Sequence, residues 1–288
     1  MLQHKKELLP GHFLFVPLIM PTHTINTFYN STQMEADRLG QHVFQLEKIR
    51  SQEIILRYLK PSMDIADIGG ATGAYSFWLH DLGHRMHLLD AAEFHIETAT
   101  RISITDNKPL ASIVLGDARQ LPFDDEQFDL VLLFGPLYHL QERTDRIKSI
   151  AEAKRVLKKD GVLLAATISR HASLFDGFWQ GFIDDPAFEN ILQQDLEDGN
   201  HFNPVRNPMY FTDAHFHTQN EIEEEFTAAG FTKFETIAIE GFGWLVPDFM
   251  KRWNNEDSRN KMLQYIRQTE TDSILIGISA HVMTAAKK

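Results

Sequence analysis

The sequence contains no cysteine among its 288 residues. This absence excludes disulfide bonds, thiolate metal ligands and cysteine nucleophiles, so the interior must be held together by packing. A chain without cysteine is compatible with a reducing compartment, and we expect a cytoplasmic protein.

Positive charge is scarce as well. Lys and Arg number 28 against 40 Asp and Glu, which gives a formal net charge of −12 at pH 7. Because such a protein would approach nucleic-acid phosphates against its own field, we predict no nucleic-acid partner. The expected partner is a small-molecule substrate. The sequence leaves the oligomeric state open, and a homo-oligomer is compatible with it.

Long apolar runs are missing too. The most membrane-like segment, residues 12–20, is far shorter than the roughly 20 apolar residues that span a bilayer. It also lacks the small-residue cleavage site of a signal peptide. We therefore predict no membrane partner and interpret residues 1–20 as an N-terminal extension.

What is present is a globular composition, with 43% hydrophobic and 24% charged residues. Short apolar runs between Ile65 and Ile168 are typical of buried strands, and helical spacing separates most of them. These runs are residues 65–68, 86–89, 113–115, 130–134 and 162–168. Strands that alternate with helices predict an α/β fold with a doubly wound, mostly parallel sheet, whose ligands bind beyond the carboxyl ends of the strands.

We predict one domain over residues 21–288, in four parts. Its parts are a helical cap (21–60), a cofactor-binding core (61–170), an inserted substrate lid (171–217) and a C-terminal completion of the sheet (218–288). The cap is helix-rich from Glu35 to Lys60, and Pro61 prevents its continuation. The lid segment fits neither the helix nor the strand period and is rich in aromatic side chains.

The C-terminal part carries clear local signals. Thr218 and Glu221 form a capping box that predicts a helix start, and Gly230 predicts its end. A strand over 233–239, a helical stretch over 249–266 and a last strand over 273–283 should follow.

The strongest chemical signal is a glycine-rich turn between a strand and a helix that starts near Ala74. Its sequence is Asp-Ile-Gly-Gly-Ala-Thr-Gly over residues 67–73. Gly69 and Gly73 permit positive φ and close backbone approach, and the helix N-terminus adds unpaired N–H groups, which suits a nucleoside ligand. The alternative is a tight strand-to-helix turn without a ligand.

Two further acidic residues stand at predicted strand ends. Asp90 lies 23 residues after Asp67, about one βαβ unit, where a carboxylate can accept hydrogen bonds from ribose hydroxyls. Asp117 ends the next strand. A single terminal Asp is more often a helix cap, but three in succession favour a ligand site.

These segments resemble the motifs of class I S-adenosylmethionine-dependent methyltransferases. The matching segments are 67–73, 89–90, 116–123, 128–140, and 152–157 with Gly161. The resemblance implies a seven-stranded Rossmann-like sheet with an antiparallel last strand, and S-adenosylmethionine as cofactor. The usual middle glycine of the turn is Ala71 in this chain, which is the smallest change that could be made there.

The resemblance also implies roles for single residues. The first acidic residue and the glycines surround the methionine part, the second acidic residue holds the ribose, and a Gly-Asp-Ala segment binds adenine. The candidate cofactor-binding residues are Asp67, Gly69, Gly70, Gly73, Asp90, Asp117, Ala118 and Phe134.

Two other classes stay open for the same core. A nicotinamide-dependent oxidoreductase would have a G-x-G-x-x-G turn, whereas this turn has G-G-x-x-G. Asp67 before the glycines would repel a pyrophosphate but attract the ammonium of S-adenosylmethionine. A non-catalytic S-adenosylmethionine-binding protein is the other alternative.

Methyl transfer requires alignment of an in-line attack more than covalent help. Tyr138 and His139, which follow the fourth strand, are the candidate catalytic residues at the methyl side of the cofactor. The alternatives are a wall of the pocket for Tyr138, whose phenol stays protonated at neutral pH, and a structural hydrogen bond to the loop for His139. The acceptor is expected to be a small or medium organic molecule, and its reacting atom is open. His215 and His217 lack a clear third ligand, so no metal is predicted.

Overall fold

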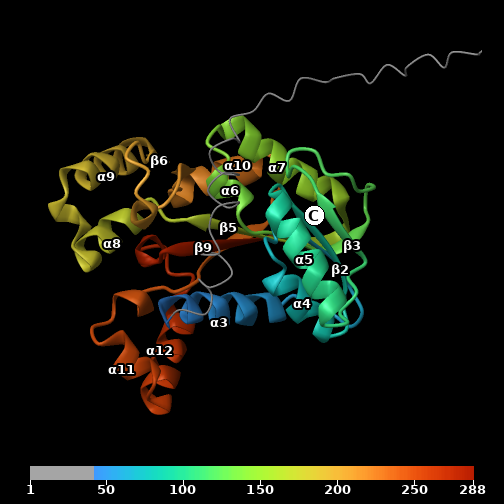
Figure 1. Ribbon diagram of the computed structural model, residues 1–288, viewed down its shortest axis with the longest axis horizontal. Coiled ribbons are helices and arrows are strands. Elements are labelled where there is room, and N and C mark those ends of the chain that lie inside the picture. Colours follow the sequence, from blue (N-terminus) through green and yellow to red (C-terminus); the bar gives the residue numbers. More distant parts are fainter. Residues whose placement is uncertain (1–41) are drawn as a thin grey trace, which may run out of the picture.

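The computed structural model describes residues 42–288, and its centre is a seven-stranded sheet (Figure 1). The strand order is β3-β2-β1-β4-β5-β9-β8. The strands are β1 Asp64–Ile68, β2 Arg85–Asp90, β3 Ser112–Leu115, β4 Phe128–Leu133, β5 Leu157–Ile168, β8 Phe234–Ala238 and β9 His281–Lys287. Only β9 runs antiparallel to its neighbours, β5 and β8. The predicted α/β fold with a mostly parallel sheet and an antiparallel last strand is confirmed.

The parallel strands end together at one edge of the sheet. β1 lies between β2 and β4, with Ile68 opposite Leu89 on one side and Leu133 on the other. Asp90 and the residues after Ile68 and Leu133 are therefore neighbours in space. This is the edge at which ligands bind in doubly wound folds.

Successive residues of the central strands point to opposite faces of the sheet, and helices cover both. The flanking helices are α3 His42–Leu56, α4 Ala74–Asp81, α5 Glu93–Thr105, α7 Arg143–Val156 and α10 Gln219–Ala228. Ile65 packs with side chains of α3 and α4, whereas Ala66 and Ile68 pack with those of α7 and α10. The capping box of Thr218 and Glu221 is present at the start of α10, as predicted.

In the C-terminal part the predicted start of the last strand is wrong, and the predicted helical stretch is divided. The last strand begins at His281, eight residues later than Ser273, because η4 Ile276–Ile278 turns once and buries Ile276 in the core. The stretch over 249–266 is two helices, α11 Phe249–Trp253 and α12 Glu256–Thr269, because the Asn255 side chain accepts from the Ser258 N–H and starts a new helix.

α3 is the described part of the predicted cap helix. It ends at Leu56, before Pro61, because the N–H groups of Arg57 and Tyr58 turn back to carbonyls three residues earlier. The extension over 1–20 and the cap residues 21–41 lie outside the described residues. No described helix is long and apolar enough to cross a membrane.

The segment over 171–217 contains two helices, so the expectation that it fits neither period is wrong. Its elements are α8 Ala172–Gln180, η1 Phe182–Asp184, α9 Pro186–Asp198, β6 Asn200–His201, η2 Pro208–Tyr210 and β7 Ala214–His215. Asp185 caps α9, Pro186 occupies its first turn and Gly199 ends it at φ +79°. The segment projects beyond the sheet next to β5 (Figure 1), with a small core of its own around Phe188 and Tyr210.

Candidate functional site

The glycine-rich turn brings the chain close to the loop after β4. Gly69 has φ +76°, and a Cβ there would lie 2.5 Å from the Phe134 carbonyl oxygen and 2.6 Å from Pro136 Cδ. Gly73, at φ +92°, precedes the first turn of α4. Ala71 adopts φ +47°, the left-handed conformation that a glycine would take more easily. The departure from the usual motif therefore costs some backbone strain but preserves the turn.

Asp90 fixes this turn to the end of β2. Its Oδ2 accepts from the Ala71 N–H at 2.9 Å, and its Oδ1 accepts from the Ala92 N–H at 2.8 Å. His95 Nδ1 lies 3.0 Å from the same Oδ1. These contacts hold the carboxylate in one orientation at the carboxyl edge of the sheet.

A cavity of about 140 Å³ lies at this edge, and we call it the strand-end pocket. The predicted residues that line it are Gly69, Asp90, Asp117, Ala118, Tyr138 and His139. The sequence analysis missed His95 and Arg119, which also line it. The predicted residues Asp67, Gly70, Gly73 and Phe134 do not line the pocket, so any effect they have on a ligand there is indirect.

Asp67 lies under the turn. It is fully buried, its Oδ2 accepts from Ser76 Oγ at 2.7 Å, and its Oδ1 has no hydrogen-bond partner among the described residues. A Cβ on Gly70 would come within 2.7 Å of this carboxyl group. Burial, together with the negative charge of Asp90, raises the pKa of Asp67 to about 6, although the Ser76 hydrogen bond opposes this.

Asp117 is held by Arg119. Its carboxylate accepts from the Arg119 backbone N–H at 2.8 Å and from Nε at 3.0 Å, while Arg119 Nη1 reaches Asp145 at 2.6 Å. Burial alone would raise the pKa of Asp117, but the hydrogen bonds and charge of Arg119 lower it. The group is therefore an ionised hydrogen-bond acceptor at the rim of the strand-end pocket.

Tyr138 and His139 stand on α6 Pro136–His139, the short helix after β4. Their rings contact each other, with centroids 4.7 Å apart. The His139 ring also stacks on Phe211 of the 171–217 segment at 6.1 Å and 22°. The loop that borders the strand-end pocket is thus in contact with the inserted segment.

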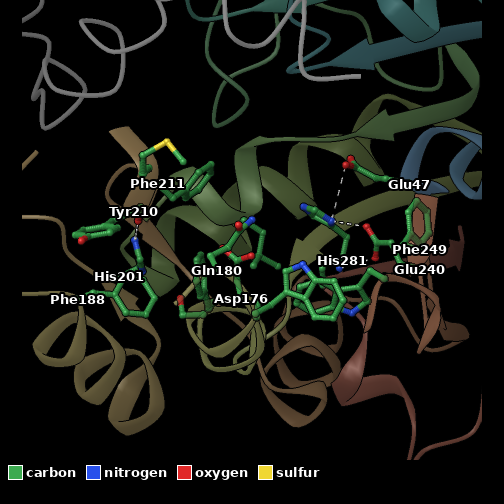
Figure 2. A pocket seen from close by; sticks show the side chains of 18 of the residues that line it. Glu47, Asp176, Gln180, Phe188, His201, Tyr210, Phe211, Glu240, Phe249 and His281 are labelled. Carbon is green, nitrogen blue, oxygen red and sulfur yellow. Dashed lines mark hydrogen bonds and ion pairs between the residues drawn. The ribbon is translucent and has the colours of Figure 1, made fainter. Parts of the chain in front are cut away.

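Phe211 also lines a second, larger cavity of about 1070 Å³, which we call the insertion cavity (Figure 2). It lies between α8 and α9 on one side and α3, η3 Gly243–Leu245 and α11 on the other. Its aromatic walls are formed by Trp179, Phe188, Tyr210, Phe211, Phe216, Trp244 and Phe249. Trp244 belongs to η3, between β8 and α11.

One end of the insertion cavity is polar (Figure 2). His281 Nδ1 lies 2.7 Å from Glu240 Oε1 and 4.0 Å from Glu47 Oε2. Glu240 also accepts from the His281 backbone N–H at 2.9 Å, and the positive charge of His281 helps to lower the pKa of Glu240 against the effect of burial. The sequence analysis missed this trio, because its members are distant in sequence and follow no motif.

The polar end of the insertion cavity contains a group of side chains that could bind a metal ion. The ligand atoms of Glu47, Glu240 and His281 all lie within 4.8 Å of one another, a donor set that could hold a divalent cation. His215 and His217 are buried with their rings in contact, and desolvation lowers the pKa of His215 to about 2. They are not part of that group.

The protein thus combines a doubly wound α/β fold, a pocket at the ends of β1, β2 and β4, and a larger cavity beside it. Residues 66–165 match a family model described as "Methyltransferase domain". A curated relative, the ubiquinone/menaquinone biosynthesis C-methyltransferase UbiE of Bordetella avium, is 32% identical over 127 residues, 40% of this chain. The match spans 44% of that relative, less than half its length.

Two further relatives extend the comparison. "Probable tRNA methyltransferase 9B" of Homo sapiens is 31% identical over 109 residues, 38% of this chain and 22% of that protein. A solved structure from Thermotoga maritima, titled a SAM-dependent methyltransferase and possible histamine N-methyltransferase, superposes with a TM-score of 0.53 at 19% identity. It covers 93% of this chain and 99% of that one, and shows a shared fold.

Residues 66–165 thus form a methyltransferase domain, as the motifs predict, and the similarity supports the class I fold and S-adenosylmethionine as the cofactor. The nicotinamide-dependent and non-catalytic alternatives are not favoured. The predicted exclusion of nucleic acid is not supported, because one relative is named as a tRNA methyltransferase.

Proposed function

We propose that this chain transfers the methyl group of S-adenosylmethionine to a small or medium organic molecule bound in the insertion cavity. The contact between His139 and Phe211 carries the proposal, because it joins a residue of the strand-end pocket to a wall of the insertion cavity. A cofactor in the first cavity and an acceptor in the second would meet at α6. The absence of cysteine from the chain is compatible with the reducing environment of the cytoplasm, and we propose that location.

In this proposal each predicted residue has a physical task. Asp90 accepts from the ribose hydroxyls, Asp117 and Ala118 border the adenine, and Gly69 lets the backbone approach the cofactor. The predicted residues that do not line the pocket stabilise the conformation of the turn; they are Asp67, Gly70, Gly73 and Phe134. The transfer step needs little covalent help from the protein, because the sulfonium is already activated. It needs mainly an aligned acceptor and exclusion of water.

Tyr138 and His139 would border the transferred methyl and align the acceptor. Residues 171–217 would act as the substrate lid, since α8 and α9 supply one wall of the insertion cavity. Closure of such a segment excludes solvent from a reactive cofactor.

Calorimetry and transfer of a labelled methyl group test the proposal. We expect the protein to bind S-adenosylmethionine and S-adenosylhomocysteine, to leave NAD unbound, and to label small molecules of a cell extract but not purified bulk tRNA. Label on tRNA alone would reject the small-molecule acceptor, and binding of NAD in place of S-adenosylmethionine would reject the proposed reaction.

A further inference from the structure

The insertion cavity is unusually acidic for a space with aromatic walls. Four carboxylate residues line it, Glu47, Asp176, Glu240 and Asp248. Among the described lining residues, Lys251 is the only lysine or arginine. Even with His281 protonated, the trio of Glu47, Glu240 and His281 holds two carboxylates against one positive charge.

Burial makes this charge costly. The side chains of Glu47 and Glu240 are 12% and 3% exposed. On α8, Asp176 is partly buried, and desolvation raises its pKa despite a hydrogen bond to Gln180. A bound cation would offset the desolvation of these carboxylates, whereas a bound anion would add to it.

The aromatic walls favour the same kind of ligand. Trp244 and Phe249 line the cavity together with Glu47 and His281, and Figure 2 shows Phe249 at this polar end. An ammonium group is attracted to the face of an aromatic ring as well as to a carboxylate. Carboxylates framed by aromatic rings are therefore suited to a basic amine with an apolar body.

A metal ion fits the trio less well than an ammonium group does. Glu240 already accepts hydrogen bonds on both oxygens, from the His281 backbone N–H and Ser279 Oγ on one and from His281 Nδ1 on the other. A metal on Nδ1 would require loss of the hydrogen that lies between these two groups. The two carboxylates of the trio can attract an ammonium group without a ligand bond to Nδ1.

The position of the trio sets the size of the ligand. His281 starts β9, which is separated from β4 by β5 alone. Two strand spacings amount to about 10 Å. A molecule that contacts His281 and also reaches the end of β4 must span about this distance.

We propose that the acceptor is a medium-sized organic amine, with an apolar or aromatic body and a basic nitrogen held at the Glu47–Glu240–His281 end of the insertion cavity. This inference rests on the proposed function, because it names the class of molecule that the same site methylates.

Three probes of one shape and different charge test it: 4-phenylbutylamine, 4-phenylbutan-1-ol and 5-phenylpentanoate. Calorimetry at pH 7.5 uses the full chain saturated with S-adenosylhomocysteine. We expect the amine to bind at least tenfold more tightly than the alcohol, and the carboxylate most weakly. Equal binding of amine and alcohol, tighter binding of the carboxylate, or no binding by any probe would overturn the inference.

Variants assign the effect to the cavity. Glu47→Gln should weaken binding of the amine about tenfold and leave the affinity for the alcohol unchanged. Asp176→Asn tests a second carboxylate of the cavity, on another helix. Glu197→Gln, an exposed carboxylate on α9, removes the same charge outside the cavity and should change neither affinity. Equal effects of Glu47→Gln and Glu197→Gln on the amine would contradict specific recognition.

The same titrations separate this inference from the proposed function. S-adenosylhomocysteine that binds normally to a protein without amine preference would reject only the amine. Failure to bind S-adenosylhomocysteine would reject the proposed function, and the probes can then be titrated into the protein alone.

Discussion

The strand-end pocket and the insertion cavity lie at the same edge of the sheet but are built in different ways. All lining residues of the first come from one continuous stretch, between Gly69 and Leu140, and its shape is set by backbone turns. The second takes Glu47 from α3, aromatic rings from the inserted segment and His281 from the last strand. One site depends on local conformation, and the other depends on packing between distant elements.

This difference explains how the two sites can change independently. At the glycine turn of the strand-end pocket few substitutions fit, because a Cβ on Gly69 would clash with the chain after β4. A cavity formed by side chains of an insertion can be altered residue by residue without disturbing the cofactor. Four predictions test this contrast, from the largest expected effect to the smallest.

Substitution of Gly69 by Ala should cause the largest loss. The added Cβ would lie 2.5 Å from the Phe134 carbonyl oxygen and 2.6 Å from Pro136 Cδ, so the turn must move. We expect affinity for S-adenosylmethionine, measured by calorimetry, to fall about a hundredfold or more, since about 2.7 kcal/mol corresponds to two decades.

The matched control is Gly83→Ala. Gly83 has φ +90°, so it carries similar backbone strain, but nothing lies within 4 Å of its added Cβ. It should lower the free energy of unfolding by about 1 kcal/mol and leave cofactor affinity unchanged. Equal affinity losses in the two variants would mean that strain, and not close approach, explains the glycine.

Asp90→Ala should cause the second largest effect. The carboxylate accepts from the Ala71 and Ala92 N–H groups and, in our proposal, from the ribose. Loss of charged hydrogen bonds worth roughly 1.5–3 kcal/mol each should weaken S-adenosylmethionine binding by about ten- to a hundredfold or more. Glu47→Gln, at the insertion cavity, should leave that affinity within about twofold. Unchanged affinity in Asp90→Ala would remove Asp90 from the cofactor site.

Sequence reasoning succeeded where the signal is local. The glycine turn, the acidic residue at the end of β2 and the Thr218–Glu221 box are each set by a few adjacent residues, and the structure contains the turn, the strand end and the box as predicted. Gly69 and Asp90 can therefore be assigned to one edge of the sheet from the sequence alone.

It failed where distant packing decides. Glu240 and His281 are 41 residues apart, and nothing in either neighbourhood predicts their hydrogen bond. β9 starts late because Ile276 is buried by tertiary contacts that propensity does not contain. In α9, however, a readable signal was overlooked, since Asp185 and Pro186 form a local helix start.

The third prediction concerns the contact between the two sites. Phe211→Ala removes the ring that stacks on His139, so the acceptor should be aligned less well while the cofactor pocket stays intact. We expect kcat to fall about tenfold, with affinity for S-adenosylmethionine within about twofold, and the same pattern for Tyr138→Phe and His139→Ala.

Phe202→Ala is the control, because Phe202 lies in the same inserted segment with an exposed ring. It should change neither kcat nor affinity. A loss of cofactor affinity in Phe211→Ala that matches its loss of turnover would show that the two sites are not separable at this contact.

The smallest expected effect is a pH dependence of stability that comes from Asp67. Its pKa is raised from 3.8 to about 6 in the folded protein, mainly by burial. The folded state thus binds this proton more tightly than the unfolded state does. The stabilising contribution is complete below pH 3.8 and is lost as pH rises through 6.

In Asp67→Asn the group no longer titrates, so the variant gains stability relative to the wild type as pH rises. By linkage the gain between pH 5 and pH 7.5 is about 1 kcal/mol, and it levels off above that. Urea unfolding at several pH values measures this gain in the free energy of unfolding.

Ser76→Ala removes the hydrogen bond that favours the ionised carboxylate of Asp67. The stability of this variant should therefore continue to fall to higher pH than that of the wild type. A difference between Asp67→Asn and wild type that stays constant from pH 5 to 8 would mean that Asp67 does not titrate in this range, and that the turn in front of it tolerates a buried charge without strain.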